Sequence, residues 1–105
     1  MSKNITNKEF KEIHSQEEAH IIDVRTISEV AQGIIPGAKH IDIMNPQFLT
    51  DVNKLPKEKT YLVYCRSGNR SSMACSVMEK HGFKTVYNLG RGIMGWDGDL
   101  TELEN

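Results

Sequence analysis

The sequence predicts an α/β fold in which a mostly parallel central sheet carries helices on both faces. Short apolar runs alternate with segments whose apolar residues have helical spacing, and two helix-opening capping boxes lie between these runs. The residues of the run Thr60–Tyr64 are β-branched, aromatic or apolar, as in a strand covered on both sides. Alternating strands and helices favour a parallel sheet, because parallel neighbours need a crossover connection.

The first predicted elements are a helix and a buried strand. Thr6 and Glu9 form a capping box that opens an amphipathic helix through Phe10 and Ile13. The apolar run Ala19–Val24 then predicts a strand.

A short helix and a second strand are expected next. Thr26 and Glu29 form another capping box, which predicts the start of that helix. Pro36 and the glycine after it mark a turn before a strand at Ala38–Ile43.

The second half of the chain continues the alternation. Asn45 is expected to cap a helix that has Pro46 in its first turn and continues through Phe48 to Val52. The strand Thr60–Tyr64 leads to a helix over Ser71–His81, and Lys84–Leu89 predicts a further strand. In such sheets a ligand site lies at the carboxyl ends of the strands.

The loop after Thr60–Tyr64 has the composition of a reactive thiolate site. Cys65 ends the strand, Arg66 and Arg70 flank the loop, and a helix begins just beyond it. Unpaired N–H groups at a helix start favour an anion, and nearby cations lower a thiol pKa. Gly68 can take a positive φ that turns successive amides inward, and Ser67 can add a hydroxyl donor. The alternative is that Cys65 is a small buried apolar residue.

Other side chains have more ordinary interpretations. Asp23 and Arg25 follow a buried strand and can pair, either to fix the base of the loop or as a structural ion pair only. Cys75 is expected in the core, with an accessible thiol as the alternative. The helical spacing of Met73 and Met78 also predicts core positions.

Composition indicates one small domain over residues 1–105, a length that supports one core. Thirteen basic and 14 acidic residues indicate neither nucleic acid nor an anionic membrane as partner. The N-terminal residues lack the apolar core of a signal peptide, which predicts a cytoplasmic location and argues against a disulfide. The four histidines lack zinc-site spacing with the two cysteines, so no metal is expected.

Four sequence blocks in a fixed order resemble the rhodanese-like sulfurtransferases. They are Asp23-Val24-Arg25 with Glu29, the segment Gly33-Ile34-Ile35-Pro36-Gly37-Ala38, the loop Cys65–Arg70, and Leu89-Gly90-Arg91-Gly92-Ile93 with Trp96.

The resemblance implies a rhodanese-like fold and a thiosulfate sulfurtransferase that needs no cofactor. Cys65 would take the outer sulfur of thiosulfate, or of a persulfide donor as the alternative, and form a persulfide. It would then pass the sulfur to a small acceptor such as cyanide or a thiol, or to a protein cysteine. The residues implied in substrate binding are Arg25, Arg66, Ser67, Gly68, Asn69 and Arg70. Asp23 and Ser71 are expected to support the loop.

Loop length separates two chemistries on this type of fold. Family members have four residues between the cysteine and the arginine, as between Cys65 and Arg70 here, whereas related phosphatases and arsenate reductases have five. One residue adds about 3.3–3.6 Å of chain, which changes the cradle from one fitting a sulfur atom to one fitting a tetrahedral oxyanion. Sulfur transfer is therefore expected, with oxyanion chemistry or a non-catalytic binding module as the alternatives.

Two positions depart from the family pattern. Ile34 stands where a histidine is frequent, and Arg91 with the following glycine stands where a Gly-Gly pair is frequent. Arg91 is expected to add a cation near the mouth of the site and to influence substrate choice.

Overall fold

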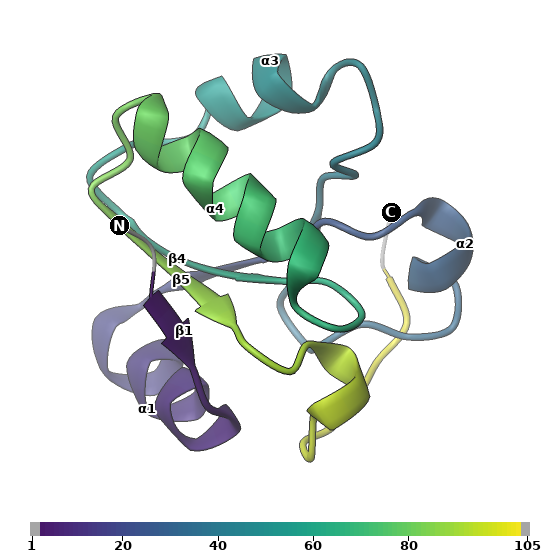
Figure 1. Cartoon of the computed structure of the whole chain (residues 1–105). Coiled ribbons are helices and arrows are strands. Elements are labelled where there is room, and N and C mark those ends of the chain that lie inside the picture. Colours follow the sequence, from purple (N-terminus) through teal and green to yellow (C-terminus); the bar gives the residue numbers. More distant parts are fainter. Residues whose placement is uncertain (1–2, 104–105) are drawn as a thin grey trace.

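The structure is a computed structural model that describes residues 3–103. Five parallel strands form one sheet in the order β1-β5-β4-β2-β3. Strands β1, β5 and β4 are labelled in Figure 1. In chain order they are β1 (Lys3–Ile5), β2 (His20–Asp23), β3 (Lys39–His40), β4 (Thr60–Tyr64) and β5 (Thr85–Leu89). The helices are α1 (Asn7–Glu17), α2 (Ile27–Val30), α3 (Phe48–Asn53) and α4 (Asn69–Lys80), followed by the 3-10 turn η1 (Ile93–Gly95). The predicted α/β class is confirmed.

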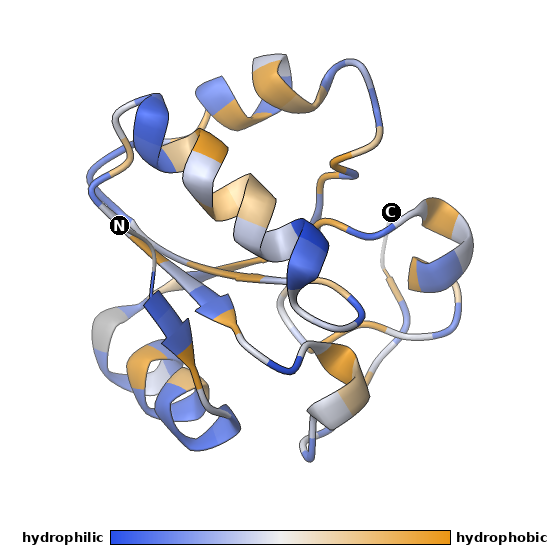
Figure 2. Cartoon of the chain, viewed as in Figure 1, coloured by the Kyte–Doolittle hydropathy of each residue, from blue (hydrophilic) through white to orange (hydrophobic). Residues whose placement is uncertain are grey.

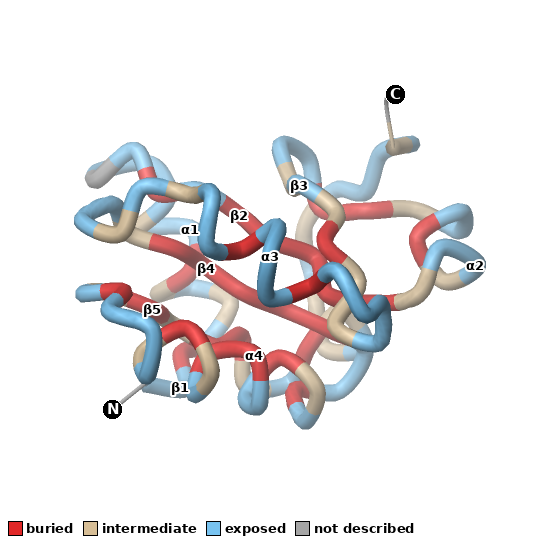
Figure 3. The backbone as a smooth tube through the Cα atoms, turned by 90° about the horizontal axis from the view of Figure 1, so that it is seen from above, coloured by how far each residue is buried: buried red, intermediate tan, exposed pale blue. Residues whose placement is uncertain are grey.

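Each face of the sheet has its own apolar core. Alternate residues of β4 point to opposite faces, so Val63 packs with α3 and α4 while Leu62 packs with α1. Figure 2 shows apolar residues along the middle of the sheet, and Figure 3 shows buried backbone running through β2, β4 and β5 beneath more exposed helices. The prediction of a sheet covered by helices on both faces is therefore correct.

Both predicted capping boxes are present. Thr6 and Thr26 each accept a hydrogen bond from the backbone N–H three residues on, and the Glu9 and Glu29 carboxylates accept one from the N–H of the capping threonine. These reciprocal bonds satisfy donors that a helix start leaves unpaired. They fix where α1 and α2 begin.

Three elements begin or end more than one residue away from the predicted position. The strand expected over Ala38–Ile43 is limited to β3, because the Asp42 carboxylate accepts the Met44 N–H and turns the chain. Asn45 does not cap a helix; its side chain accepts the Gln47 N–H in a turn, and α3 starts only after Gln47. Helix α4 starts two residues before the predicted Ser71, directly after the loop that carries Cys65.

Strand β1 was not predicted. It pairs in parallel with β5 at the edge of the sheet, and Ile5 is its one buried residue. Within residues 3–103, no helix has the length and apolar character needed to cross a bilayer.

Candidate active site

The candidate site lies at the carboxyl ends of β2, β4 and β5, where sequence reasoning had placed it. Cys65 directly follows β4, and α4 begins four residues later with Gly68 as its N-cap. The segment after β5 folds into η1 beside the same loop (Figure 1). Three segments that are distant in sequence therefore surround one cysteine.

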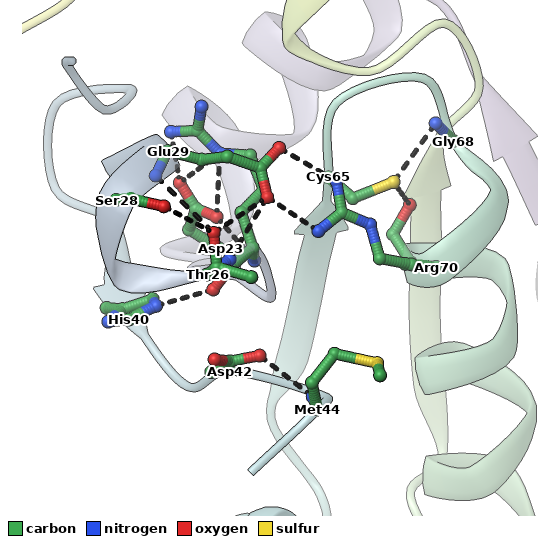
Figure 4. A network of polar contacts seen from close by, with 12 residues as sticks. Asp23, Thr26, Ser28, Glu29, His40, Asp42, Met44, Cys65, Gly68 and Arg70 are labelled. Atoms are coloured by element: carbon green, nitrogen blue, oxygen red, sulfur yellow. Dashed lines mark hydrogen bonds and ion pairs between the residues drawn. The ribbon is translucent and has the colours of Figure 1, made fainter. Parts of the chain in front are cut away.

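The Cys65 sulfur accepts hydrogen bonds from two residues that lie close to it in sequence. The Gly68 N–H lies 3.1 Å from Sγ and the Ser71 hydroxyl lies 3.3 Å from it, and the residue is only 1% exposed (Figure 4). Burial raises the pKa of the thiol, but hydrogen bonds from the Ser71 hydroxyl and from the N–H groups of Ser71, Gly68 and Ser67 outweigh it. The pKa of Cys65 is therefore below its usual value, which favours the nucleophilic thiolate.

Gly68 has the backbone conformation that the sequence predicted. Its φ of +103° lies in the region that side chains disfavour, and a Cβ here would stand 2.3 Å from the carbonyl oxygen of Gly90. Both the conformation and the close approach of the next loop require glycine. This geometry aims the Gly68 N–H at the sulfur.

The loop after β5 supports the cysteine loop from behind. The carbonyl oxygens of Cys65 and Arg66 accept the N–H groups of Ile93 and Met94 at 2.9 and 3.0 Å. Gly92 has a φ of +62°, and a Cβ there would lie 2.3 Å from the Arg66 carbonyl oxygen. The departure from a Gly-Gly pair falls on Arg91, which is exposed, while the position in contact with the loop remains glycine.

The expected pair between Asp23 and Arg25 is present and buried. The Arg25 guanidinium donates to both carboxylate oxygens at 2.7–3.0 Å and also to the Gly33 carbonyl at 2.7 Å. Burial lowers the pKa of Arg25, but the hydrogen bonds and charge of Asp23 outweigh it and the pKa lies above its usual value. Arg25 therefore remains a fixed cation at the end of β2.

Arg70 makes a contact that the sequence analysis did not predict. Its guanidinium forms a two-pronged bond with Glu29, at 2.7 and 2.9 Å, and joins the start of α4 to α2 (Figure 4). This contact raises the pKa of Arg70, with a smaller contribution from the Cys65 charge, and lowers the pKa of Glu29 to about 2. Arg70 is thus oriented by Glu29 while its charge still acts on the thiolate.

The Glu29–Arg70 pair predicts a change in acid stability. The pKa of Glu29 is depressed in the fold, so the pair stabilises the protein above the usual pKa of 4.5, and this stabilisation is lost as pH falls towards about 2. Glu29→Gln should lower the free energy of unfolding at neutral pH by on the order of 1 kcal/mol. Between about pH 5 and 2, the free energy of unfolding should decrease less in this variant than in the wild type. Urea unfolding across this range measures both effects. The exposed Glu12, replaced by glutamine, is the control, and identical pH profiles for all three proteins would contradict the prediction.

Two hollows lie beside the loop, one lined in part by Arg66 and the other in part by Ser67. One, of about 380 Å³, is lined by Arg25, Glu29, Gln32, Arg66, Ile93 and Met94. The other, of about 290 Å³, is lined by Ser67, Gly90, Arg91, Met94 and Gly95. Arg66, Ser67 and Asn69 are exposed, and Arg91 adds a cation at the second hollow, as expected for the mouth of an anion site.

Cys75, Met78 and Met73 lie outside the loop, and the sequence predicted core positions for all three. Cys75 is fully buried, as predicted, and burial raises the pKa of its thiol to about 12. Met78 is also buried, but Met73 is 65% exposed, so its predicted core position was wrong. Among residues 3–103, no cluster of three or more histidine, cysteine or acidic side chains could hold a metal ion.

Sequence reasoning missed a buried polar residue behind the loop. Asn88, on β5, is 2% exposed and bonds to Ser71, to the Gly68 carbonyl and to Asn4. Its one signal in the sequence was a polar residue inside an otherwise apolar strand pattern.

Comparison with known proteins places this arrangement in a family. The family model for the Rhodanese-like domain matches residues 6–99. The chain is 42% identical over 99 residues to the putative sulfurtransferase YtwF of Bacillus subtilis (strain 168), covering 92% of each protein. It is 31% identical over 94 residues to thiosulfate sulfurtransferase GlpE of Pseudomonas putida (strain GB-1), covering 90% of this chain and 84% of that protein.

A solved structure has the same architecture. The crystal structure of a rhodanese-like domain protein from Staphylococcus aureus is similar to this chain with a TM-score of 0.84 and 31% identity. The match covers 97% of this chain and 99% of that one. The resemblance expected from the four sequence blocks is confirmed, and the chain belongs to the rhodanese-like domain family.

Proposed function

We propose that this protein is a sulfurtransferase that moves sulfane sulfur from thiosulfate, or from a persulfide donor, through a persulfide on Cys65 to a thiophilic acceptor. The observation that carries the proposal is the Cys65 sulfur, which is buried at the base of a four-residue loop with the Gly68 N–H and the Ser71 hydroxyl directed at it. The similarity to proteins named sulfurtransferases supports rhodanese-type sulfur transfer as the reaction class.

In the first half-reaction the Cys65 thiolate attacks the outer sulfur of thiosulfate. A new S–S bond forms, the S–S bond of thiosulfate breaks, and its electron pair leaves with sulfite. Two negative charges of the donor approach Arg66 and Arg25 at the hollow beside the loop. Loop N–H groups from Arg66 to Arg70 then surround the terminal persulfide anion, as preorganised donors do where charge develops.

In the second half-reaction an acceptor takes the outer sulfur. Cyanide, for example, bonds to that sulfur and leaves as thiocyanate, and the electron pair of the broken S–S bond stays on Cys65 as thiolate. A small thiol or a cysteine of another protein reacts in the same way. The proposal places both half-reactions in this one domain, without a cofactor, in the cytoplasm, where both cysteines remain free thiols.

A phosphatase or arsenate reductase on the same fold is the competing proposal. It requires a tetrahedral oxyanion to sit within the loop, above a cysteine that is only 1% exposed. The short loop and the deep sulfur favour a donor that presents a narrow terminal atom, as the outer sulfur of thiosulfate does. A non-catalytic binding module is disfavoured because Cys65 is present and both the Gly68 N–H and the Ser71 hydroxyl donate to its sulfur.

Mass spectrometry of the intact protein after brief treatment with thiosulfate tests the proposal. We expect a gain of one sulfur atom, located by peptide mapping to Cys65 and removed by cyanide with release of thiocyanate. Hydrolysis of an aryl phosphate by a protein that gains no sulfur would overturn the proposal in favour of oxyanion chemistry. Sulfur gain from a protein persulfide but not from thiosulfate would retain the persulfide mechanism and change the donor.

Arg66 should accelerate loading by thiosulfate. It is exposed at the hollow, and none of the ion pairs found among residues 3–103 involves it. Its charge is therefore available to attract a dianion. Arg66→Gln should slow sulfur loading roughly tenfold at low salt and make the rate less sensitive to ionic strength. Lys84→Gln, which removes an exposed charge at the opposite end of β5, is the control and should load at the wild-type rate. Equal rates for the two variants would show that Arg66 does not attract the donor.

A further inference from the structure

The side chain of Asn88 lies behind the cysteine loop and joins three parts of the protein. Its amide nitrogen donates to the Gly68 carbonyl at 3.1 Å and to Asn4 Oδ1, on β1, at 2.9 Å. Its amide oxygen accepts the Ser71 hydroxyl at 2.5 Å. A buried amide with all of these bonds formed is a well-determined polar network.

The orientation of the Asn88 amide follows from its partners. Reversing it would place its oxygen against the Gly68 carbonyl oxygen, a backbone group that can only accept a hydrogen bond. The oxygen must therefore face Ser71. Ser71 Oγ thus always has a fixed acceptor on the side away from the cysteine.

The Ser71 hydroxyl has one hydrogen and two acceptors. Asn88 Oδ1 lies 2.5 Å from its oxygen and Cys65 Sγ lies 3.3 Å from it. Only one of these bonds can be made at a time. A charged sulfur attracts the hydrogen more strongly than an amide oxygen does, because bonds to an ionised acceptor are stronger than neutral ones. When the sulfur is uncharged, the amide is the better acceptor.

We propose that Asn88 is a positioning residue that acts through Ser71. It supplies the acceptor to which the hydroxyl turns when the Cys65 sulfur is uncharged, and from which it returns when the thiolate forms. Without Asn88 the hydroxyl would lack a partner on that side and would remain directed at the sulfur. Asn88 also holds the carbonyl of Gly68, whose N–H is the other donor to Sγ.

Within the proposed function, the Ser71 hydroxyl changes its acceptor as the negative charge moves between the outer sulfur and the Cys65 sulfur. In the persulfide the negative charge is on the outer sulfur, so the inner sulfur needs no donor and the hydroxyl bonds to Asn88. When the acceptor removes the outer sulfur, the electron pair returns to Cys65 and the hydroxyl turns to stabilise the leaving thiolate. This part of the inference rests on the proposed function, whereas the effect on the thiol itself does not.

Alkylation of Cys65 by iodoacetamide across a pH series tests the proposal in a double-mutant cycle. Ser71→Ala should slow alkylation near neutral pH about tenfold, because a donor to the thiolate is lost. Asn88→Ala should speed it a few-fold when Ser71 is present, because the competing acceptor is lost, and should give no such increase in the Ser71→Ala background. Equal fold-changes in both backgrounds would overturn the proposal.

Asn88→Asp provides a second, opposite test that does not depend on Asn88→Ala folding. A carboxylate accepts the Ser71 hydrogen more strongly than an amide does, so alkylation should slow several-fold and the pH profile should move to higher pH. The slowing should be smaller in the Ser71→Ala background, where only the direct charge remains. Unchanged or faster alkylation of a folded Asn88→Asp protein, judged by its thermal melt, would overturn the proposal.

The two proposals fail in different ways. Alkylation needs no sulfur donor, so the double-mutant cycle can be measured and interpreted even if thiosulfate does not load the protein. If loading succeeds and the cycle is additive, the sulfurtransferase proposal stands and the role of Asn88 is wrong. In a protein that does load, Asn88→Asp should also slow the discharge of the persulfide by cyanide several-fold.

Discussion

Replacing Cys65 with serine is expected to reduce sulfur loading by a factor of about 10⁴ or more, because a serine hydroxyl stays protonated at neutral pH and offers no sulfur for a persulfide. Serine is similar in size, and its hydroxyl can accept the Gly68 N–H and the Ser71 hydroxyl that now bond to Sγ. The thermal melt should therefore remain close to that of the wild type. Thiocyanate release from thiosulfate and cyanide measures the loss.

Cys75 provides the matched control for this experiment. It is fully buried and burial raises the pKa of its thiol to about 12, so it should remain protonated and inert. Cys75→Ser should load sulfur at the wild-type rate while losing about 1–3 kcal/mol of stability, because a hydroxyl replaces a thiol in the core. A folded Cys75→Ser protein that no longer accepts sulfur would show that Cys65 does not act alone.

The parts of the fold that were predicted are those specified by local sequence. A capping box needs only residues three positions apart, and a buried central strand carries its apolar run within a few residues. Strand β1 has neither signal, because it is short, two of its three residues are exposed, and its stability comes from pairing with β5 more than 80 positions away. Edge strands of this kind depend on tertiary pairing.

The spacing of the buried residues in α4 shows why the predicted core position of Met73 was wrong. The buried residues of α4 are Ser71, Ala74, Cys75 and Met78, which follow the spacing of one helical face. Met73 lies outside this stripe, so its apolar character alone was a poor guide.

The candidate site was predictable where chemistry and backbone geometry act locally. The cysteine, the positive φ of Gly68 and the Asp23–Arg25 pair all follow from short motifs. The contacts of Glu29 with Arg70 and of Asn88 with Ser71 join segments 41 and 17 positions apart, and Glu29 already had a local explanation in its capping box. Because the capping box already explained Glu29, the local sequence offered no reason to expect its second contact, with Arg70.

Gly68→Ala should impair both the fold and the site, through two independent physical effects. Alanine disfavours a φ of +103°, and its Cβ would stand 2.3 Å from the Gly90 carbonyl oxygen, which belongs to backbone and cannot rotate away. The cysteine loop or the loop after β5 must therefore move. We expect a loss of about 2–4 kcal/mol in the free energy of unfolding and a fall of about 100-fold in sulfur loading.

Gly37 separates the two effects because its φ of +89° is similarly unfavourable while no atom lies within 4 Å of its would-be Cβ. Gly37→Ala should lose only about 1 kcal/mol from backbone strain and should load sulfur normally. In Gly68→Ala, displacement of the Gly68 N–H removes a donor to Sγ, so the pKa of Cys65 should rise and alkylation by iodoacetamide should need a higher pH. If Gly68→Ala instead keeps the wild-type pH profile while losing stability, the Gly68 N–H does not stabilise the thiolate, and the remaining donors from Ser71 and Ser67 must be sufficient.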